Sequence, residues 1–275
     1  MTKNLIKIHG GKYRIRKYLA QYLPNMGKIK RLVSPFVGGG SFEFLLLDKY
    51  KFDYVLFNDL DNDLINLYEE VRDNPRFINR LGIIKYSDVN FKIFKDLTPK
   101  DKMDSATKRF VLSRMSRGGL CKNFGTSSRL RGGQNEYKNA WENAIKELPE
   151  ISKKLQDVET LSIDAVALLR DNIRDFDFED VFIYMDPPYL LSTRTAKKCY
   201  SNEMDDSQHE ELLQVINEYK NAKIMLSGYF SSLYEKYLID NWTRQSIVTS
   251  NNSGQNKTKS TRTEIVWTNY DYLTE

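Results

Sequence analysis

An apolar run at residues 181–185, followed directly by Asp186, Pro187, Pro188 and Tyr189, constrains the fold of this chain more than any other feature. The run is short and rich in β-branched and aromatic residues, as is typical of a strand buried in a parallel sheet. Proline cannot extend a hydrogen-bonded ladder, so the predicted strand ends at the carboxylate of Asp186. Open α/β sheets bind ligands at the carboxyl ends of their parallel strands, which makes this segment a candidate catalytic site.

The chemistry of these four residues matches a planar substrate that carries an amino group. The carboxylate of Asp186 accepts hydrogen bonds, and the two prolines hold the neighbouring backbone carbonyls in fixed directions. The ring of Tyr189 offers a flat face for stacking. The simpler alternative is a turn that leaves the strand, with an aspartate acting as a helix cap. The four residues alone leave both interpretations open.

A glycine-rich turn follows the first predicted sheet strand, at residues 31–36. Gly38, Gly39 and Gly40 let the backbone approach a ligand closely, although a plain tight turn explains them equally well. Ser41 is a candidate N-cap for the helix that comes next. The spacing is not G-x-G-x-x-G, so a pyrophosphate-binding dinucleotide site is disfavoured.

Two acidic residues follow predicted strands and are candidate ligand contacts. Asp59 comes after the strand at residues 54–57, about twenty residues beyond the glycines, where an acid can accept hydrogen bonds from ribose hydroxyls. Asp164 follows another strand, and it either meets an adenine amino group or caps the next helix. Asp61 and Asp63 are expected to cap and charge the start of a helix. The glycines and Asp59 together predict a nucleoside-containing cofactor.

The remaining periodicity predicts one α/β sheet domain that an insert interrupts. Further strands are predicted at residues 158–163, 224–226, 245–249 and 264–268, and helices at residues 13–23, 42–47, 63–71, 165–170, 207–219 and 231–238. From residue 75 the sequence becomes basic and irregular, with helices expected at 106–115 and 138–155 around an exposed loop at 116–134. We therefore predict a catalytic domain of residues 1–74 and 158–275 and a mainly helical insert at residues 75–157.

Positive charge is concentrated in this insert. Residues 102–138 contain nine Lys or Arg and two acids, so their local net charge of +7 exceeds the +5 of the whole chain. A second basic stretch, residues 244–262, contains no acid. Such local excess indicates a polyanionic partner, whereas the alternative is a solvated helix face and a mobile loop.

Composition limits the class of protein and of site. No apolar run approaches the ~20 residues of a membrane span, and the first residues lack the apolar core of a signal peptide. Cys121 and Cys199 are expected to be free thiols in a reducing cytoplasm. With two histidines in the chain, a histidine-rich metal site is not expected.

The ordered set of motifs resembles the Dam-type DNA adenine-N6 methyltransferases over nearly the whole chain. The matching segments are residues 10–12, 35–41, 58–59, 63–68 and 186–189, with a looser match at 118–121 inside the insert. The resemblance implies a Rossmann-like class I methyltransferase sheet of seven strands with an antiparallel last hairpin. It also implies S-adenosyl-L-methionine as cofactor and double-stranded DNA as substrate, bound by a monomer or by a dimer on the DNA.

From the residues and the resemblance together, we expect cofactor contacts from four segments and from the catalytic acid. These are Ile8, Gly11, Lys12, Pro35, Phe36, Gly38, Gly39, Gly40, Ser41, Asp59, Asp164 and Asp186. Ile8 stands where family members often carry Trp, so aromatic stacking on the cofactor is lost there. Gly39 replaces an alanine of some relatives, a change expected to be harmless.

The chemistry required for adenine agrees with the residues themselves. Asp186 accepts one N6 hydrogen and the Pro187 carbonyl accepts the other, which keeps electron density on a nitrogen that then attacks the sulfonium methyl. Positioning and electrostatics supply the rate, so no Cys or His nucleophile is needed. Tyr189 is expected to stack on a base flipped out of the duplex.

The insert and the last basic loop are expected to contact DNA. Candidate contacts are Arg114, Arg117, Lys122, Asn123, Arg129, Arg131, Gln134, Lys257, Lys259 and Arg262. GATC, the family's commonest target, is one candidate recognition site. The alternatives are an RNA adenine or guanine methyltransferase and an inactive nucleic-acid-binding homologue. Protein glutamine methyltransferases carry Asn in place of Asp186, which disfavours that activity.

Overall fold

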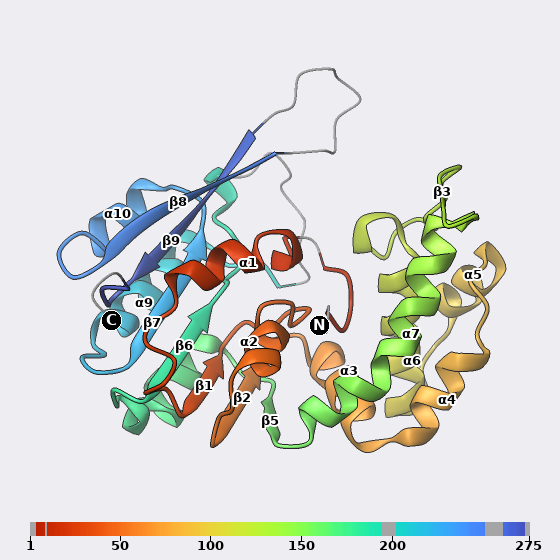
Figure 1. Ribbon diagram of the computed structural model, residues 1–275, viewed down its shortest axis with the longest axis horizontal. Coiled ribbons are helices and arrows are strands. Elements are labelled where there is room, and N and C mark those ends of the chain that lie inside the picture. Colours follow the sequence, from red (N-terminus) through yellow and green to blue (C-terminus); the bar gives the residue numbers. More distant parts are fainter. Residues whose placement is uncertain (1–3, 9, 194–201, 251–260, 273–275) are drawn as a thin grey trace. The chain divides into compact units, whose positions relative to one another are not determined.

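The computed structural model describes residues 4–8, 10–193, 202–250 and 261–272 (Figure 1). Seven strands form one mixed sheet in the order β5-β2-β1-β6-β7-β9-β8. β1 pairs in parallel with β2 and β6, and β6 with β7, whereas β9 runs antiparallel to both β7 and β8. The predicted methyltransferase-type sheet with an antiparallel last hairpin is therefore confirmed. The strands are β1 (Arg31–Ser34), β2 (Tyr54–Asn58), β5 (Val158–Leu161), β6 (Val181–Met185), β7 (Lys223–Gly228), β8 (Thr243–Ser250) and β9 (Thr261–Thr268).

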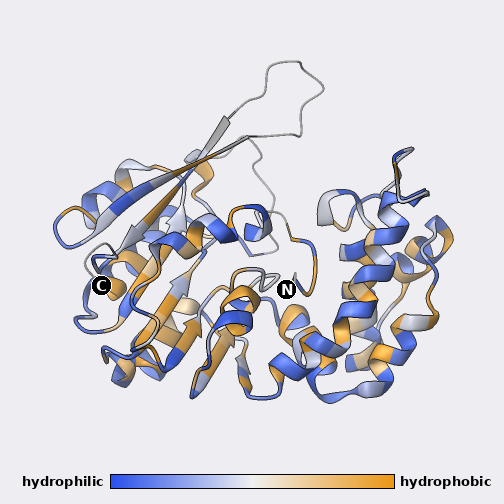
Figure 2. Cartoon of the chain, viewed as in Figure 1, coloured by the Kyte–Doolittle hydropathy of each residue, from blue (hydrophilic) through white to orange (hydrophobic). Residues whose placement is uncertain are grey.

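β6 lies at the centre of the sheet because its sequence has no polar face. All five of its residues are buried, and it pairs on one edge with β1 and on the other with β7. A strand covered on both faces has a continuous apolar sequence, which is why its position was predictable. Figure 2 shows the same character in β1 and β2, which are largely hydrophobic.

The helices agree with the periodicity in most places and differ in three. They are η1 (Lys12–Arg14), α1 (Arg16–Leu19), η2 (Ala20–Tyr22), α2 (Glu43–Lys49), α3 (Asn62–Asp73), α4 (Pro75–Ile83), α5 (Asp88–Asp96), α6 (Lys102–Met115), η3 (Arg117–Gly119), α7 (Glu136–Leu155), α8 (Ala165–Ala167), η4 (Leu168–Asn172), η5 (Arg174–Phe176), η6 (Leu191–Thr193), α9 (Asp206–Asn217) and α10 (Ser232–Tyr237). The helix predicted at 13–23 is three short pieces, η1, α1 and η2, and neither Ile15 nor Leu19 caps a helix with its side chain. The helix predicted at 165–170 is the single turn α8 followed by the π-helical turn η4.

The third difference is that α4 and α5 occupy a stretch predicted to be irregular. Asn74 and Ser87 cap these helices by accepting hydrogen bonds from the backbone N–H groups of Arg76 and Asn90. Pro75 stands in the first turn of α4, where its missing N–H costs nothing. The loop predicted at 116–134 contains η3 and a two-stranded hairpin, β3 (Leu130–Arg131) with β4 (Gln134–Asn135).

The chain packs as two compact units. The first comprises Met1–Tyr13, Gly38–Lys49 and Asp61–Ser162, and the second comprises Arg14–Val37, Tyr50–Leu60 and Ile163–Glu275. The predicted insert, residues 75–157, lies entirely within the first unit, together with segments that the sequence assigned to the catalytic domain. The boundaries 75 and 157 themselves stay a prediction.

The first unit is built on α3, which packs against α6 and α7. Leu67 and Val71 of α3, Phe110 of α6 and Trp141 of α7 are buried, and the Phe110 and Trp141 rings meet edge to face at 5.6 Å. The Trp141 indole N–H donates to the Ile84 carbonyl at 3.0 Å, which satisfies the polar atom of a buried ring. The insert helices therefore share one apolar core.

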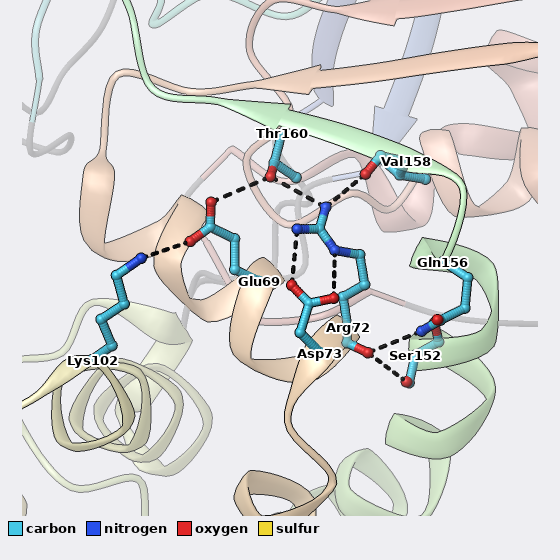
Figure 3. A network of polar contacts seen from close by, with 8 residues as sticks. All are labelled: Glu69, Arg72, Asp73, Lys102, Ser152, Gln156, Val158 and Thr160. Atoms are coloured by element: carbon cyan, nitrogen blue, oxygen red, sulfur yellow. Dashed lines mark hydrogen bonds and ion pairs between the residues drawn. The ribbon is translucent and has the colours of Figure 1, made fainter.

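Figure 3 shows a network of polar contacts within this unit. The Arg72 guanidinium forms a two-point contact with Asp73, with both N–O distances at 2.9 Å, and donates to the Val158 carbonyl at 2.7 Å. Glu69, one turn earlier on α3, pairs with Lys102 at 3.3 Å. The network joins α3 to β5 and to the start of α6, and it is structural.

Asn58 fixes three chain segments at the carboxyl ends of the strands in the second unit. Its fully buried side chain donates to the Pro35 and Ile163 carbonyls, both at 3.0 Å, and accepts from the Ile163 N–H at 3.1 Å. Its backbone carbonyl accepts from Val37 N–H at 2.9 Å. Asn58 therefore fixes, through its side chain and its backbone carbonyl, the segment that leaves β1 and the segment before α8.

Replacing Asn58 with Ala should lower the free energy of unfolding by about 3 kcal/mol, because each buried polar group that loses its partner costs roughly 1–3 kcal/mol. Urea denaturation measures the change. Asn90→Ala is the matched control, since its side chain donates to the Lys85 carbonyl in an exposed position and its loss should cost less. Equal losses in the two variants would contradict the structural role of Asn58.

Candidate active site

Asp186 follows β6 directly, at the carboxyl end of the central strand. Its side chain is half-buried, and the Ser227 hydroxyl lies 3.2 Å from its Oδ1. Ser227 is on the neighbouring strand β7 and also lies 3.2 Å from the Tyr184 hydroxyl. The predicted catalytic acid is therefore held at the sheet edge by a buried polar side chain that the sequence did not single out.

Tyr189 is buried and contacts two side chains, one from the last strands and one from the segment after β7. It is 6% exposed, its hydroxyl donates to the buried carboxylate of Glu264, and its ring lies 4.4 Å from that of Tyr229. Stacking of Tyr189 on a base therefore stays a prediction. Glu264 and Tyr229 were not identified as site residues from the sequence. The one available signal was that Glu264 is an acid at the start of an apolar strand.

The other polar candidates of the second unit also lie at strand ends. Pro35 and Phe36 follow β1, and Asp59 follows β2 with a half-buried side chain. Because β1, β2 and β6 are parallel neighbours, these ends meet at the same edge of the sheet as Asp186. Asp164 caps α8, with its Oδ1 accepting from two backbone N–H groups at 2.9 and 3.0 Å. The capping prediction for Asp164 is confirmed, and its contact with adenine stays a prediction.

The glycine loop belongs to the first unit and is shaped by its own neighbours. Gly38 and Gly40 have φ of 51° and 69°, a region that favours glycine. A Cβ on Gly39 would lie 2.8 Å from the Ile6 carbonyl oxygen, so alanine there would force the backbone to move. The expectation that glycine is harmless where some relatives carry alanine stays a prediction, and the close approach of Ile6 shows that this chain needs glycine there. At Gly38 a Cβ would meet Ile8 at 3.8 Å.

Of the N-terminal candidates, Ile8 lies beside the glycine loop, whereas Lys12 contacts its own segment. Ile8 reaches Gly38, and its carbonyl accepts from Gly11 N–H at 3.2 Å. Lys12 is buried, and its ammonium group donates to the Gly10 carbonyl at 3.3 Å. Ser41 is buried at the start of the segment that leads into α2. The structure therefore brings Ile8 and Gly38 together, and a cofactor contact for Lys12 stays a prediction.

Arg114 holds the fold in this structure, and its predicted contact with DNA stays a prediction. It is buried on α6, where its guanidinium donates to the Leu5 carbonyl at 2.9 and 3.2 Å and to the Asn4 carbonyl. Burial lowers the pKa of Arg114 to about 10, so the group stays protonated at neutral pH. Its charge-assisted bonds hold residues 4–5 against α6.

The other candidates of the basic insert are exposed. Arg117, Lys122, Asn123, Arg129 and Gln134 all lie at the surface of the first unit. Two backbone contacts hold the base of their loop. Ser116 and Phe124 form an isolated antiparallel β-bridge, and the Arg117 N–H donates to the Asn123 carbonyl at 2.9 Å. Arg131 and Arg262 belong to β3 and β9 by their backbone, although their side chains are not described. Lys257 and Lys259 lie outside the described residues.

Neither a metal cluster nor a membrane-spanning helix occurs in the described residues. Among them, no group of three or more His, Cys, Asp or Glu side chains could hold a metal ion. None of the helices in the described part of the chain is long and apolar enough to cross a membrane.

Comparison with known proteins agrees with the resemblance in the motifs. The model of the family described as D12 class N6 adenine-specific DNA methyltransferase matches residues 9–253. The type II methyltransferase M.MjaIII of Methanocaldococcus jannaschii is 28% identical over 86% of this chain and 90% of its own. The type II methyltransferase M1.LlaDCHI of Lactococcus lactis subsp. cremoris is 26% identical over 95% and 93%.

Among solved structures, the rRNA methyltransferase AviRa from Streptomyces viridochromogenes aligns with a TM-score of 0.41 at 12% identity, covering 95% of this chain and 86% of that one. The family model spans both units, including the glycine loop, Asp59 and the Asp186 segment. The chain therefore belongs to the D12 class of N6 adenine-specific DNA methyltransferases.

Proposed function

We propose that Asp186 is the residue that holds the target adenine for methylation, with S-adenosyl-L-methionine as the methyl donor and double-stranded DNA as the substrate. The observation that carries this proposal is the position of Asp186 at the carboxyl end of the central strand β6. Family membership supports the reaction class, and it disfavours the RNA alternative because the family acts on DNA.

The chemistry follows from the acceptors that the segment presents. Adenine N6 is a poor nucleophile because its lone pair is delocalised into the ring. When the Asp186 carboxylate and the Pro187 carbonyl each accept an N6 hydrogen, electron density stays on the nitrogen. The N6–methyl bond would form as the methyl–sulfur bond of the donor breaks, and N6 would then lose one of its protons. The Ser227 hydroxyl holds the Asp186 carboxylate before substrate binds, so little reorganisation of this group is needed during the reaction.

The chain's residues fit the nucleoside-containing donor that the family implies. S-adenosyl-L-methionine supplies an electrophilic methyl group when bound. Asp59 is placed at the end of β2, where a carboxylate can accept hydrogen bonds from ribose hydroxyls. A Cβ added to Gly38 would have one described neighbour within 4 Å, the Ile8 side chain at 3.8 Å. The backbone at Gly38 therefore has room for a ligand beside it.

Replacing Asp186 with Ala should lower kcat for methylation by at least about 10²–10³-fold, the usual cost of removing one preorganised transition-state contact. Binding of duplex DNA, measured by fluorescence anisotropy, should change little. Asp240→Ala, at an exposed position of the same unit, should keep full activity. Turnover near the wild-type rate in Asp186→Ala would overturn the proposed role.

Replacing Asp59 with Ala should raise KM for the methyl donor much more than KM for DNA, because the carboxylate is proposed to contact the ribose. Steady-state kinetics with each substrate varied in turn measures both constants. A larger change in KM for DNA would contradict the ribose assignment.

Arg117 and Arg114 form a matched pair for DNA binding, one exposed and one buried. Arg117→Ala should lower the slope of log K against log salt concentration by about one, since each lost phosphate contact releases about one counterion fewer. Arg114→Gln should leave that slope unchanged and lower the melting temperature. An unchanged slope in Arg117→Ala would remove this residue from the DNA contacts.

A further inference from the structure

We propose that Ser227 is a positioning residue for the reaction, whose buried hydroxyl holds the Asp186 carboxylate while the Tyr184 hydroxyl holds Ser227. The proposal rests on the proposed function, because it needs Asp186 to be the group that holds adenine N6. In this proposal Ser227 and Tyr184 affect the rate of methylation through Asp186, without touching the substrate themselves.

The backbone of Ser227 is fixed from both sides. It lies near the end of β7, which pairs in parallel with β6 up to Met185 and Leu226. On the other edge Ser227 is paired with Val266 of the antiparallel strand β9. Its side chain is fully buried. A hydroxyl in this position has little freedom except rotation about its own Cα–Cβ and C–O bonds.

The direction of the hydrogen bonds depends on which groups carry protons. An ionised carboxylate only accepts, so the 3.2 Å contact with Asp186 Oδ1 has Ser227 as its donor. Once the Ser227 proton is used in this way, the 3.2 Å contact with Tyr184 has the Tyr184 hydroxyl as its donor. Tyr184, Ser227 and Asp186 therefore form a chain of two hydrogen bonds, in which each hydroxyl donates toward the carboxylate.

The strand geometry explains why Tyr184 can support Asp186. Residues two apart on a strand point to the same face, so Tyr184 and Asp186 both project toward the side on which Ser227 lies. Tyr184 is 1% exposed, so its ring has no room to swing away. A carboxylate oxygen has more than one lone pair, so the bond from Ser227 orients Asp186 without preventing it from accepting an N6 hydrogen.

Ser227 also lies 3.4 Å from the Met185 carbonyl, so a purely structural role has to be tested against the positioning role. The two roles predict different effects of removing both hydroxyls. In Ser227→Ala the buried Tyr184 hydroxyl loses a partner, which costs stability. In Tyr184→Phe/Ser227→Ala no hydroxyl is left without this partner, so much of the stability should return although Asp186 still lacks its donor.

The experiment compares kcat, both KM values and the urea midpoint for Ser227→Ala, Tyr184→Phe and the double variant. Ser227→Ala should lower kcat by roughly 10–100-fold, because a misplaced catalytic group costs up to about 10²-fold, and leave both KM values nearly unchanged. Tyr184→Phe keeps the Ser227–Asp186 bond and should lose less. The double variant should recover stability and keep the low kcat of Ser227→Ala.

Asp186→Ala, measured in parallel, separates the two proposals. If Asp186→Ala is inactive while Ser227→Ala turns over like wild type, the positioning role is overturned and the role of Asp186 stands. Recovery of kcat together with stability in the double variant would likewise reduce Ser227 to a structural residue. If Asp186→Ala stays active, the proposed function fails, and the role of Ser227 fails with it.

Discussion

The buried side chain of Asn58 is the interaction on which the edge of this sheet depends. Its amide bonds the segment after β1 and the segment before α8, and it stands next to Asp59 itself. Parallel strands bring their carboxyl ends together but do not fix the loops that leave them. A fully satisfied amide does so, because each displaced loop would leave a buried polar group without its partner. Asp59 and Asp164, which adjoin Asn58 and Ile163 in the chain, are therefore positioned by this residue.

The features that the sequence predicted well were local in origin. β6 is a continuous apolar run, and two prolines mark its end, so Asp186 could be placed without knowledge of the rest of the chain. Asp61 accepts from the Leu64 N–H as an N-cap, as its position before an apolar helix predicted. α4 and α5 had equally local signals in their N-caps, Asn74 and Ser87. They were missed because the basic, polar composition of this stretch favoured an irregular structure.

The features that the sequence could not predict depended on partners far along the chain. Arg114 bonds to Leu5, which is 109 residues away, and no local pattern distinguishes it from the exposed Arg117 three positions later. Ser227 and Asp186 are 41 residues apart, and Tyr189 and Glu264 are 75 apart. Charge and spacing identify an arginine or an acid as a candidate. Burial decides whether it binds a ligand or holds the fold.

The reversed direction of β9 explains how the last strands can support the site. β1, β2, β6 and β7 all end at one edge, so each contributes residues that come after its strand. β9 runs the other way, with Ile265 opposite Gly228, and so brings its first half to that edge. Glu264 therefore approaches from beyond the end of β7 and reaches the Tyr189 hydroxyl. If the strand in this place were parallel to β7, the residues near the site would be those that follow its carboxyl end, and they would belong to a loop. The antiparallel hairpin thus supplies a rigid, buried carboxylate where the fold would otherwise offer a flexible one.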